Sequence, residues 1–131
     1  MDKLLIATTN EHKIKEIAAI FAEAGITDWE IIGLNNFPDY QPPEEDGQTF
    51  AENAMIKALA AAKMSGLLTL ADDSGLTVEA LNGEPGVYSA RYADAAGQTH
   101  NDAANRHKLL SNMQDIPDGN RQAAFVCAAA L

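Results

Sequence analysis

The sequence has little of what marks secreted, membrane or redox proteins. Its one cysteine, Cys127, lies in an apolar stretch, which predicts a buried small side chain rather than a disulfide or a redox centre. No apolar run approaches the ~20 residues that span a bilayer. The N-terminus turns polar too soon for a signal peptide. We therefore expect a cytoplasmic protein.

Basic residues are also scarce. Nine lysines and arginines stand against 19 acidic residues, which gives a formal net charge of −10. This charge argues against broad binding to nucleic acid or to an anionic membrane. An anionic ligand must instead be met by a few well-placed cations, by a helix N-terminus or by a bound metal ion.

What is present is enough for one modest core. The chain has 131 residues, 47% of them hydrophobic, and no internal repeat, so we expect a single domain over residues 1–131. Apolar runs and helical patterns alternate, which predicts an α/β fold. We expect strands at 3–7, 29–34, 67–71, 76–80 and 122–131, and helices at 11–24, at 50–64 and from Thr99 or Asn101.

The first strand is followed by Thr8, Thr9 and Asn10, which are good helix caps. A helix that begins here points free N–H groups and the positive end of its dipole at one spot. Thr8, Asn10 and Lys13 can offer a hydroxyl, an amide and an ammonium to a phosphate chain there. Plain capping beside a surface lysine explains the residues equally well, since the glycine pattern of a P-loop is missing.

Two neighbouring acids, Asp72 and Asp73, follow the run 67–71 and precede Ser74 and a glycine. We interpret the run as a buried strand that ends at the acids, which places them in a loop at the ligand-binding edge of the sheet. Two carboxylates there can hold a divalent cation or take a proton from water. For this motif alone, an acidic solvated turn is the simpler interpretation.

The second helix follows a loop at residues 35–48, the acidic loop, which contains three prolines and the acids Asp39, Glu44, Glu45 and Asp46. The helix begins at a capping box, Thr49 to Glu52. Its many alanines predict close packing on a sheet, and Lys57 lies two turns into it. Acidic clusters such as the one in this loop are usually solvated surface.

Four blocks occur together in this order: TTNEHK at 8–13, EEDGQTFAENAMIKA at 44–58, ADDSGL at 71–76 and NGEPGVYSARYA at 82–93. With this set the chain resembles the inosine triphosphate pyrophosphatase family over essentially its whole length. The resemblance implies a mixed α/β sheet with flanking helices, usually in a homodimer. It also implies Mg²⁺-dependent hydrolysis of non-standard purine nucleoside triphosphates (ITP, dITP, XTP) to the monophosphate and pyrophosphate.

The resemblance also implies roles for individual residues. Asp73 would be metal ligand and general base, with Asp72 beside it, and Glu45 or its neighbour Glu44 would complete the metal site. The substrate would be held by Ser74 and by cations and turn residues: Thr8, Thr9, Asn10, Glu11, His12, Lys13 and Lys57. Arg91 and Tyr92 would line a substrate groove or a dimer contact, or else simply pack the segment that contains them.

The chain departs from the family at its end. Family members continue past the strand at 122–131 with an aromatic-glycine block and a Ser-His-Arg block that read the purine, and neither block is present. The resemblance therefore implies a domain that is incomplete at the C-terminus. Two alternatives stay open: a non-catalytic nucleotide- or Mg²⁺-binding fragment, and a related pyrophosphatase for pyrimidine or modified nucleotides, against which the TTNEHK block counts.

Overall fold

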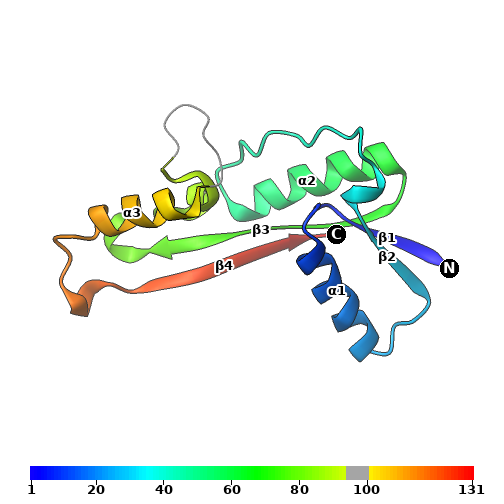
Figure 1. Ribbon diagram of the computed structural model, residues 1–131, viewed down its shortest axis with the longest axis horizontal. Coiled ribbons are helices and arrows are strands. Elements are labelled where there is room, and N and C mark those ends of the chain that lie inside the picture. Colours follow the sequence, from blue (N-terminus) through cyan, green and yellow to red (C-terminus); the bar gives the residue numbers. More distant parts are fainter. Residues whose placement is uncertain (94–100) are drawn as a thin grey trace. The chain divides into compact units, whose positions relative to one another are not determined.

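The structure, a computed structural model, describes residues 1–93 and 101–131 (Figure 1). The chain divides into two compact units, of which the first contains 1–47, 51–72 and 129–131 and the second contains 48–50 and 73–128. A four-stranded sheet has the order β2-β1-β3-β4. Its strands β3 (Leu68–Val78) and β4 (Ala123–Ala130) each contribute residues to both units.

The first unit is built on β1 (Asp2–Ile6), which pairs in parallel with both β2 (Trp29–Gly33) and β3. The three apolar residues Leu4, Leu5 and Ile6 are at most 3% exposed, because the strand has neighbours on both sides. In Figure 1 β4 runs opposite to β3, so the sheet is mixed, as predicted.

Two helices connect these strands. The first, α1 (Glu11–Glu23), begins after Asn10, and α2 (Phe50–Ser65) begins after Thr49. Both helices are followed by a glycine with positive φ, Gly25 at +74° and Gly66 at +72°, where a side chain would be strained. The predicted helix bounds are therefore confirmed to within a residue or two.

Most of the alanines of α2 face the sheet, as predicted, but Ala51 is exposed. Ala54 and Ala58 pack with Ala71 of β3 and with Ala7, the residue that follows β1. Ala61 packs against Leu5 in a second cluster. Small side chains thus bring the backbone of α2 close to the strands that precede the predicted site residues.

The second unit contains the rest of β3, the 3₁₀ segments η2 (Glu79–Leu81), η3 (Gly86–Arg91) and η4 (Asp118–Asn120), helix α3 (Asp102–Asn112) and most of β4. Segment η3 lies directly on β3, because the hydroxyl of Ser89 accepts the N–H of Leu76 (3.0 Å) and donates to the carbonyl of Gly86 (2.6 Å). A Cβ at Gly75 would lie 2.5 Å from that hydroxyl oxygen. Only glycine allows this approach.

Helix α3 holds the end of η3. Tyr92 is 6% exposed, and its hydroxyl donates to Glu84 (3.0 Å) and accepts from Asn112 (2.8 Å). The ammonium of Lys108 donates to the backbone carbonyl of Tyr92 (2.8 Å) and lies 4.4 Å from the centroid of the Tyr92 ring. Tyr92 therefore packs within its own segment, and Arg91 lies over the ring of Tyr88. A role of either residue in a substrate groove or a dimer contact stays a prediction. Asn101 caps α3; the alternative start at Thr99 lies outside the described residues.

The structure corrects two predictions. The strands predicted at 67–71 and 76–80 are not separated by a turn: β3 runs without a break from Leu68 to Val78, so Asp72 and Asp73 lie within the strand. The Ser74-Gly75 pair favours a turn locally, but the contact of Gly75 with η3 overrides that preference. Cys127 is exposed rather than buried, as is Phe125 at 87%. Apolar composition alone does not show whether a strand face is covered.

Candidate active site

The turn between β1 and α1 is ordered by its own side chains. The Asn10 carboxamide accepts the N–H groups of His12 (3.0 Å) and Lys13 (3.3 Å), and the hydroxyl of Thr8 accepts the N–H of Asn10 (3.1 Å). Thr9 is exposed, and its carbonyl accepts from Asn35 (3.4 Å). The capping interpretation is thus confirmed for Asn10, and the positive end of α1 lies at this turn.

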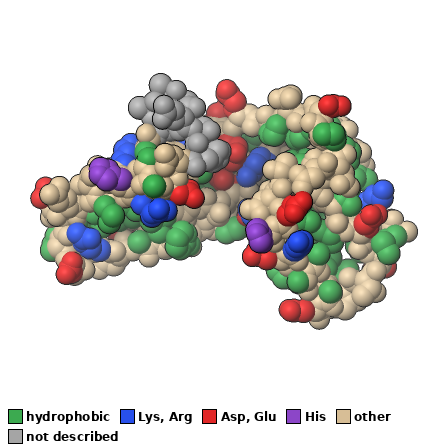
Figure 2. Space-filling model, in the orientation of Figure 1, with side chains coloured by type: hydrophobic (Ala, Val, Ile, Leu, Met, Phe, Trp, Pro, Cys, Tyr) green, Lys and Arg blue, Asp and Glu red, His purple; other side chains and the backbone are tan. Residues whose placement is uncertain are grey.

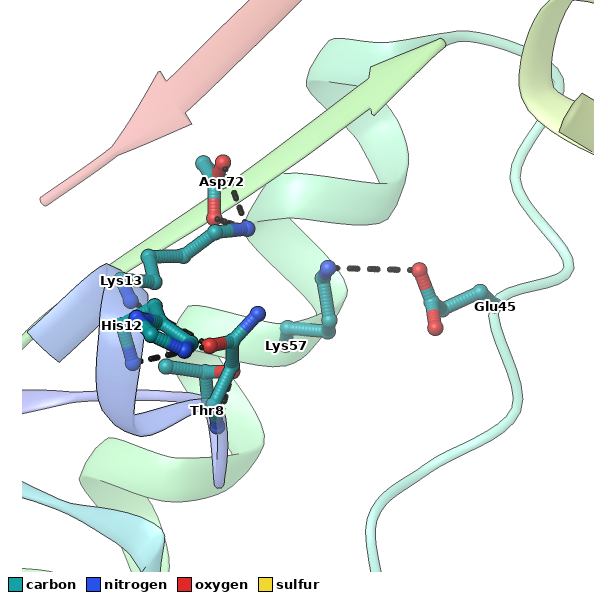
Figure 3. A network of polar contacts seen from close by, with 7 residues as sticks. Thr8, His12, Lys13, Glu45, Lys57 and Asp72 are labelled. Atoms are coloured by element: carbon teal, nitrogen blue, oxygen red, sulfur yellow. Dashed lines mark hydrogen bonds and ion pairs between the residues drawn. The ribbon is translucent and has the colours of Figure 1, made fainter. Parts of the chain in front are cut away.

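An ion pair joins this turn to β3. The Lys13 ammonium donates to both carboxylate oxygens of Asp72, at 3.0 and 3.1 Å (Figure 3). The side chains of Lys13 and Asp72 are 34% and 25% exposed, so the pair is partly screened by water. A cation in the first turn disfavours the helix, and Asp72 offsets that cost. Sequence reasoning missed this pair, because no local pattern links residues 59 positions apart.

A second ion pair lies between α2 and the acidic loop before it. The ammonium of Lys57 is 3.3 Å from a carboxylate oxygen of Glu45 (Figure 3). Of the two acids that sequence reasoning left as alternatives, Glu45 is half-buried and Glu44 is exposed. Ala7, just before the Thr8 turn, packs on Ala54 and Ala58 of α2. The two lysines therefore belong to neighbouring parts of the first unit.

Asp73 and Ser74 belong to the second unit. Side chains alternate along a strand, so Asp73 shares the face of Ala71, and Asp72 points to the opposite face, where Lys13 meets it. Ser74 lines a cavity of about 520 Å³ with Ser89, Asn105 and Phe125, among others. The predicted metal site of Glu45 with Asp73 draws on both units and stays a prediction.

A Mg²⁺ site at these residues stays a prediction. Among the described residues, no three His, Cys, Asp or Glu side chains gather into a metal-binding group. Mg²⁺ in phosphate-transferring sites is commonly held by one or two carboxylates together with substrate phosphates and water. The half-buried carboxylate of Glu45 is a hard oxygen donor of this kind.

Charges of both signs are interspersed over the face of the molecule in Figure 2. No helix of the described part of the chain is long and apolar enough to span a membrane. Lys13 and Lys57 are local positive charges in a protein whose net charge is −10.

Comparison with known sequences identifies the family of this chain. The family model described as the Ham1 family matches residues 4–131. This chain belongs to the Ham1 family. The dITP/XTP pyrophosphatase of Corynebacterium efficiens is 52% identical over 129 residues, which cover 98% of this chain and 61% of that protein. The dITP/XTP pyrophosphatase of Geobacter sulfurreducens is 50% identical over 131 residues, 100% of this chain and 63% of that protein.

Solved structures of similar proteins have the same fold as this chain. A HAM1 protein from Coxiella burnetii has a TM-score of 0.86 and 40% identity, and the match covers 99% of this chain and 62% of that one. A nucleoside-triphosphatase, dITP/XTP pyrophosphatase, from Mycobacterium abscessus has a TM-score of 0.84 and 44% identity, over 98% and 63%. The predicted fold is therefore confirmed. The chain spans less than two thirds of the length of these relatives.

Proposed function

We propose that this chain acts on non-standard purine nucleoside triphosphates (ITP, dITP and XTP) and hydrolyses them, with Mg²⁺, to the monophosphate and pyrophosphate. One observation carries the proposal: Lys13 and Lys57 are each held by a carboxylate in neighbouring parts of one unit, one of them at the positive end of α1. The names of the two relatives described above, both dITP/XTP pyrophosphatases, support the reaction.

The phosphate chain would be bound at the N-terminal turn of α1. The helix dipole and the backbone of residues 8–13 favour an anion there, and the ammonium groups of Lys13 and Lys57 add two charges. Asp72 keeps Lys13 in place, with its ammonium at 3.0 Å from a carboxylate oxygen. As the leaving pyrophosphate gains charge, both lysines stabilise it more strongly than they stabilise the bound substrate.

The attacking water would be activated by Asp73. Its carboxylate accepts a proton while the water oxygen bonds to the α-phosphorus, and the bond from that phosphorus to the bridging oxygen breaks. Pyrophosphate leaves with the electron pair of this bond. Glu45, with Glu44 as the exposed alternative, and Asp73 would hold the metal ion. When bound, Mg²⁺ supplies positive charge beside the phosphates and lowers the pKa of attached water.

The experiment that tests this proposal compares the purified chain with its Asp73→Asn variant. Each is incubated with ITP and Mg²⁺, and pyrophosphate release is measured. We expect release to fall at least about a hundredfold, because a positioned base contributes 10²- to 10⁴-fold. Unchanged release by the variant would overturn the assigned mechanism. Circular dichroism of both proteins confirms that the fold is retained.

A second candidate is non-catalytic binding of a nucleotide or of Mg²⁺. The two lysine–carboxylate pairs described above would bind a phosphate chain whether or not a reaction follows. Calorimetry that shows triphosphate binding without turnover would support it, and steady turnover would remove it.

A preference for pyrimidine nucleotides would appear when turnover of ITP, XTP, dTTP and UTP is compared.

The family resemblance further supports a homodimer in the cytoplasm, which we include in the proposal. Sedimentation equilibrium of the purified chain tests the dimer: twice the chain mass of 14.0 kDa is expected. A single-chain mass at all concentrations would contradict it.

A further inference from the structure

One polar side chain is fully buried in the alanine face of α2. Asn53 is 1% exposed, beside Ala54 at 0%. Its Oδ1 accepts the backbone N–H of Gly47 at 2.8 Å, whereas its Nδ2 is buried without an acceptor among the described residues. A buried amide lowers stability unless it is hydrogen-bonded. The atom through which Asn53 acts is therefore Oδ1, and its partner is Gly47.

Gly47 is suited to this contact by its lack of a side chain. A Cβ there would lie 2.6 Å from Oδ1 of Asn53 and 2.8 Å from Cβ of Glu52. Real Cβ atoms do not approach other atoms so closely. Any larger residue at this position would push the loop away from α2, and the bond to Asn53 would lengthen or break.

The contact bears on the candidate site through the loop that contains Gly47. Residues 37–47 form neither helix nor strand, so no ladder of backbone bonds fixes them. Glu45 lies two residues before Gly47, and Lys57 lies four residues after Asn53, on the same face of α2. The helix thus holds the loop at two points: Asn53 at the backbone of Gly47, and Lys57 at the carboxylate of Glu45, 3.3 Å away.

We propose that Asn53 is a positioning residue, whose buried carboxamide fixes the acidic loop through Gly47 and so sets Glu45 beside Lys57. It touches no reacting atom. Its effect on activity rests on the function proposed above, in which Glu45 helps to hold Mg²⁺. Loss of the contact raises the Mg²⁺ concentration needed for half-maximal turnover, while turnover at saturating Mg²⁺ changes less.

The first test follows amide hydrogen exchange at residues 44–47 in the ligand-free protein. Asn53→Ala and Gly47→Ala each speed exchange there about 10- to 100-fold, the effect of removing one buried hydrogen bond. The double variant is no faster than either single variant, because both changes break the same contact. Gly47→Ala alters only a loop and carries the test even where Asn53→Ala fails to fold.

The matched control is Ser65→Ala at the other end of α2. Ser65 also uses its side chain to accept a backbone N–H, that of Leu67 at 3.2 Å. The control leaves exchange at 44–47 unchanged. Exchange that stays slow in Gly47→Ala and in folded Asn53→Ala would overturn the proposal.

The second test measures the Mg²⁺ dependence of ITP turnover. The concentration for half-maximal turnover rises about tenfold in Gly47→Ala and Asn53→Ala and is unchanged in Ser65→Ala. Faster exchange with an unchanged Mg²⁺ requirement would overturn the positioning role. A wild-type chain without turnover would contradict the proposed function instead, and amide exchange would still decide whether Asn53 fixes the loop.

Discussion

The turn at residues 8–13 and the loop at residues 37–47 each place an ionisable side chain in a lysine–carboxylate pair, but the chain holds them differently. The turn lies between a buried strand and a capped helix, so its position is set by backbone bonds and by Asn10. The loop has no secondary structure: Phe37 and Tyr40 pack on the core near its start, and side chains of α2 hold its end. A substitution at the turn can therefore remove the lysine charge without moving the backbone. At the loop, the same kind of substitution changes both the charge and the position of the backbone.

The largest effect is expected at the turn. Lys13→Ala removes a cation that would face the phosphate chain in the proposed function, and it should lower turnover of ITP about 10²- to 10³-fold, as loss of one charge-stabilising donor does. Lys15→Ala, at an exposed position of the same helix, is the matched control and should leave turnover unchanged. Amide exchange of residues 12 and 13, whose N–H groups Asn10 accepts, should be the same as in the wild type in both variants. Fast exchange in Lys13→Ala would show that the turn depends on the ion pair after all.

At the loop, one substitution should both remove a positive charge and loosen the backbone. Lys57→Ala removes a cation and also an ion-pair partner of Glu45, so we expect turnover to fall, up to about a hundredfold, and exchange at residues 44–47 to rise. Lys63→Ala, in the last turn of α2, is the control. If loop exchange in Lys57→Ala matched the wild type, the contrast between the two regions would fail.

A smaller effect is expected when the cap is removed. Asn10→Ala should lower the free energy of unfolding by about 1 kcal/mol, the usual cost of losing a helix N-cap, as measured by urea denaturation. Asn101→Ala removes the equivalent cap of α3, where the side chain accepts the N–H of Ala104 at 3.0 Å. We expect similar losses of stability, but only Asn10→Ala should also weaken binding of inorganic tripolyphosphate. Equal binding by the two variants would place the phosphate site elsewhere.

The smallest effect concerns the second unit, far in sequence from both regions. Burial raises the pKa of Tyr92 above its ordinary value of 10.0, and hydrogen bonding with Glu84 acts in the same direction. The neutral phenol is therefore favoured in the folded state, so its contribution to stability is complete below pH 10 and is lost as the pH rises through the higher folded pKa. Tyr92→Phe should show a flatter decline of unfolding free energy above pH 10. Parallel declines in both proteins would contradict this assignment.

Much of the fold follows from local sequence patterns. Apolar runs predicted β1 and β2, and glycines predicted the ends of α1 and α2, because a positive φ at Gly25 and Gly66 is a local requirement. The continuity of β3 was not predictable in this way. It depends on Gly75 packing under η3, a contact made by residues outside the strand.

The candidate site was predictable in composition but not in pairing. Motif blocks placed Lys13, Asp72, Lys57 and Glu45 among the candidates, yet no pattern indicated that Lys13 pairs with Asp72 across 59 residues. A signal for Asn53 does exist: a polar residue on the alanine face of a helix, four residues before a lysine, indicates a buried hydrogen bond. Its partner, Gly47, requires the structure.

The most direct test of the central claim is the identity of the products formed from ITP. Purified chain is incubated with ITP and Mg²⁺, and the products are resolved by phosphorus NMR. The account predicts inosine monophosphate and pyrophosphate in equal amounts, because water attacks the α-phosphorus. Inosine diphosphate with orthophosphate would contradict it, since the other anhydride would then have been cleaved.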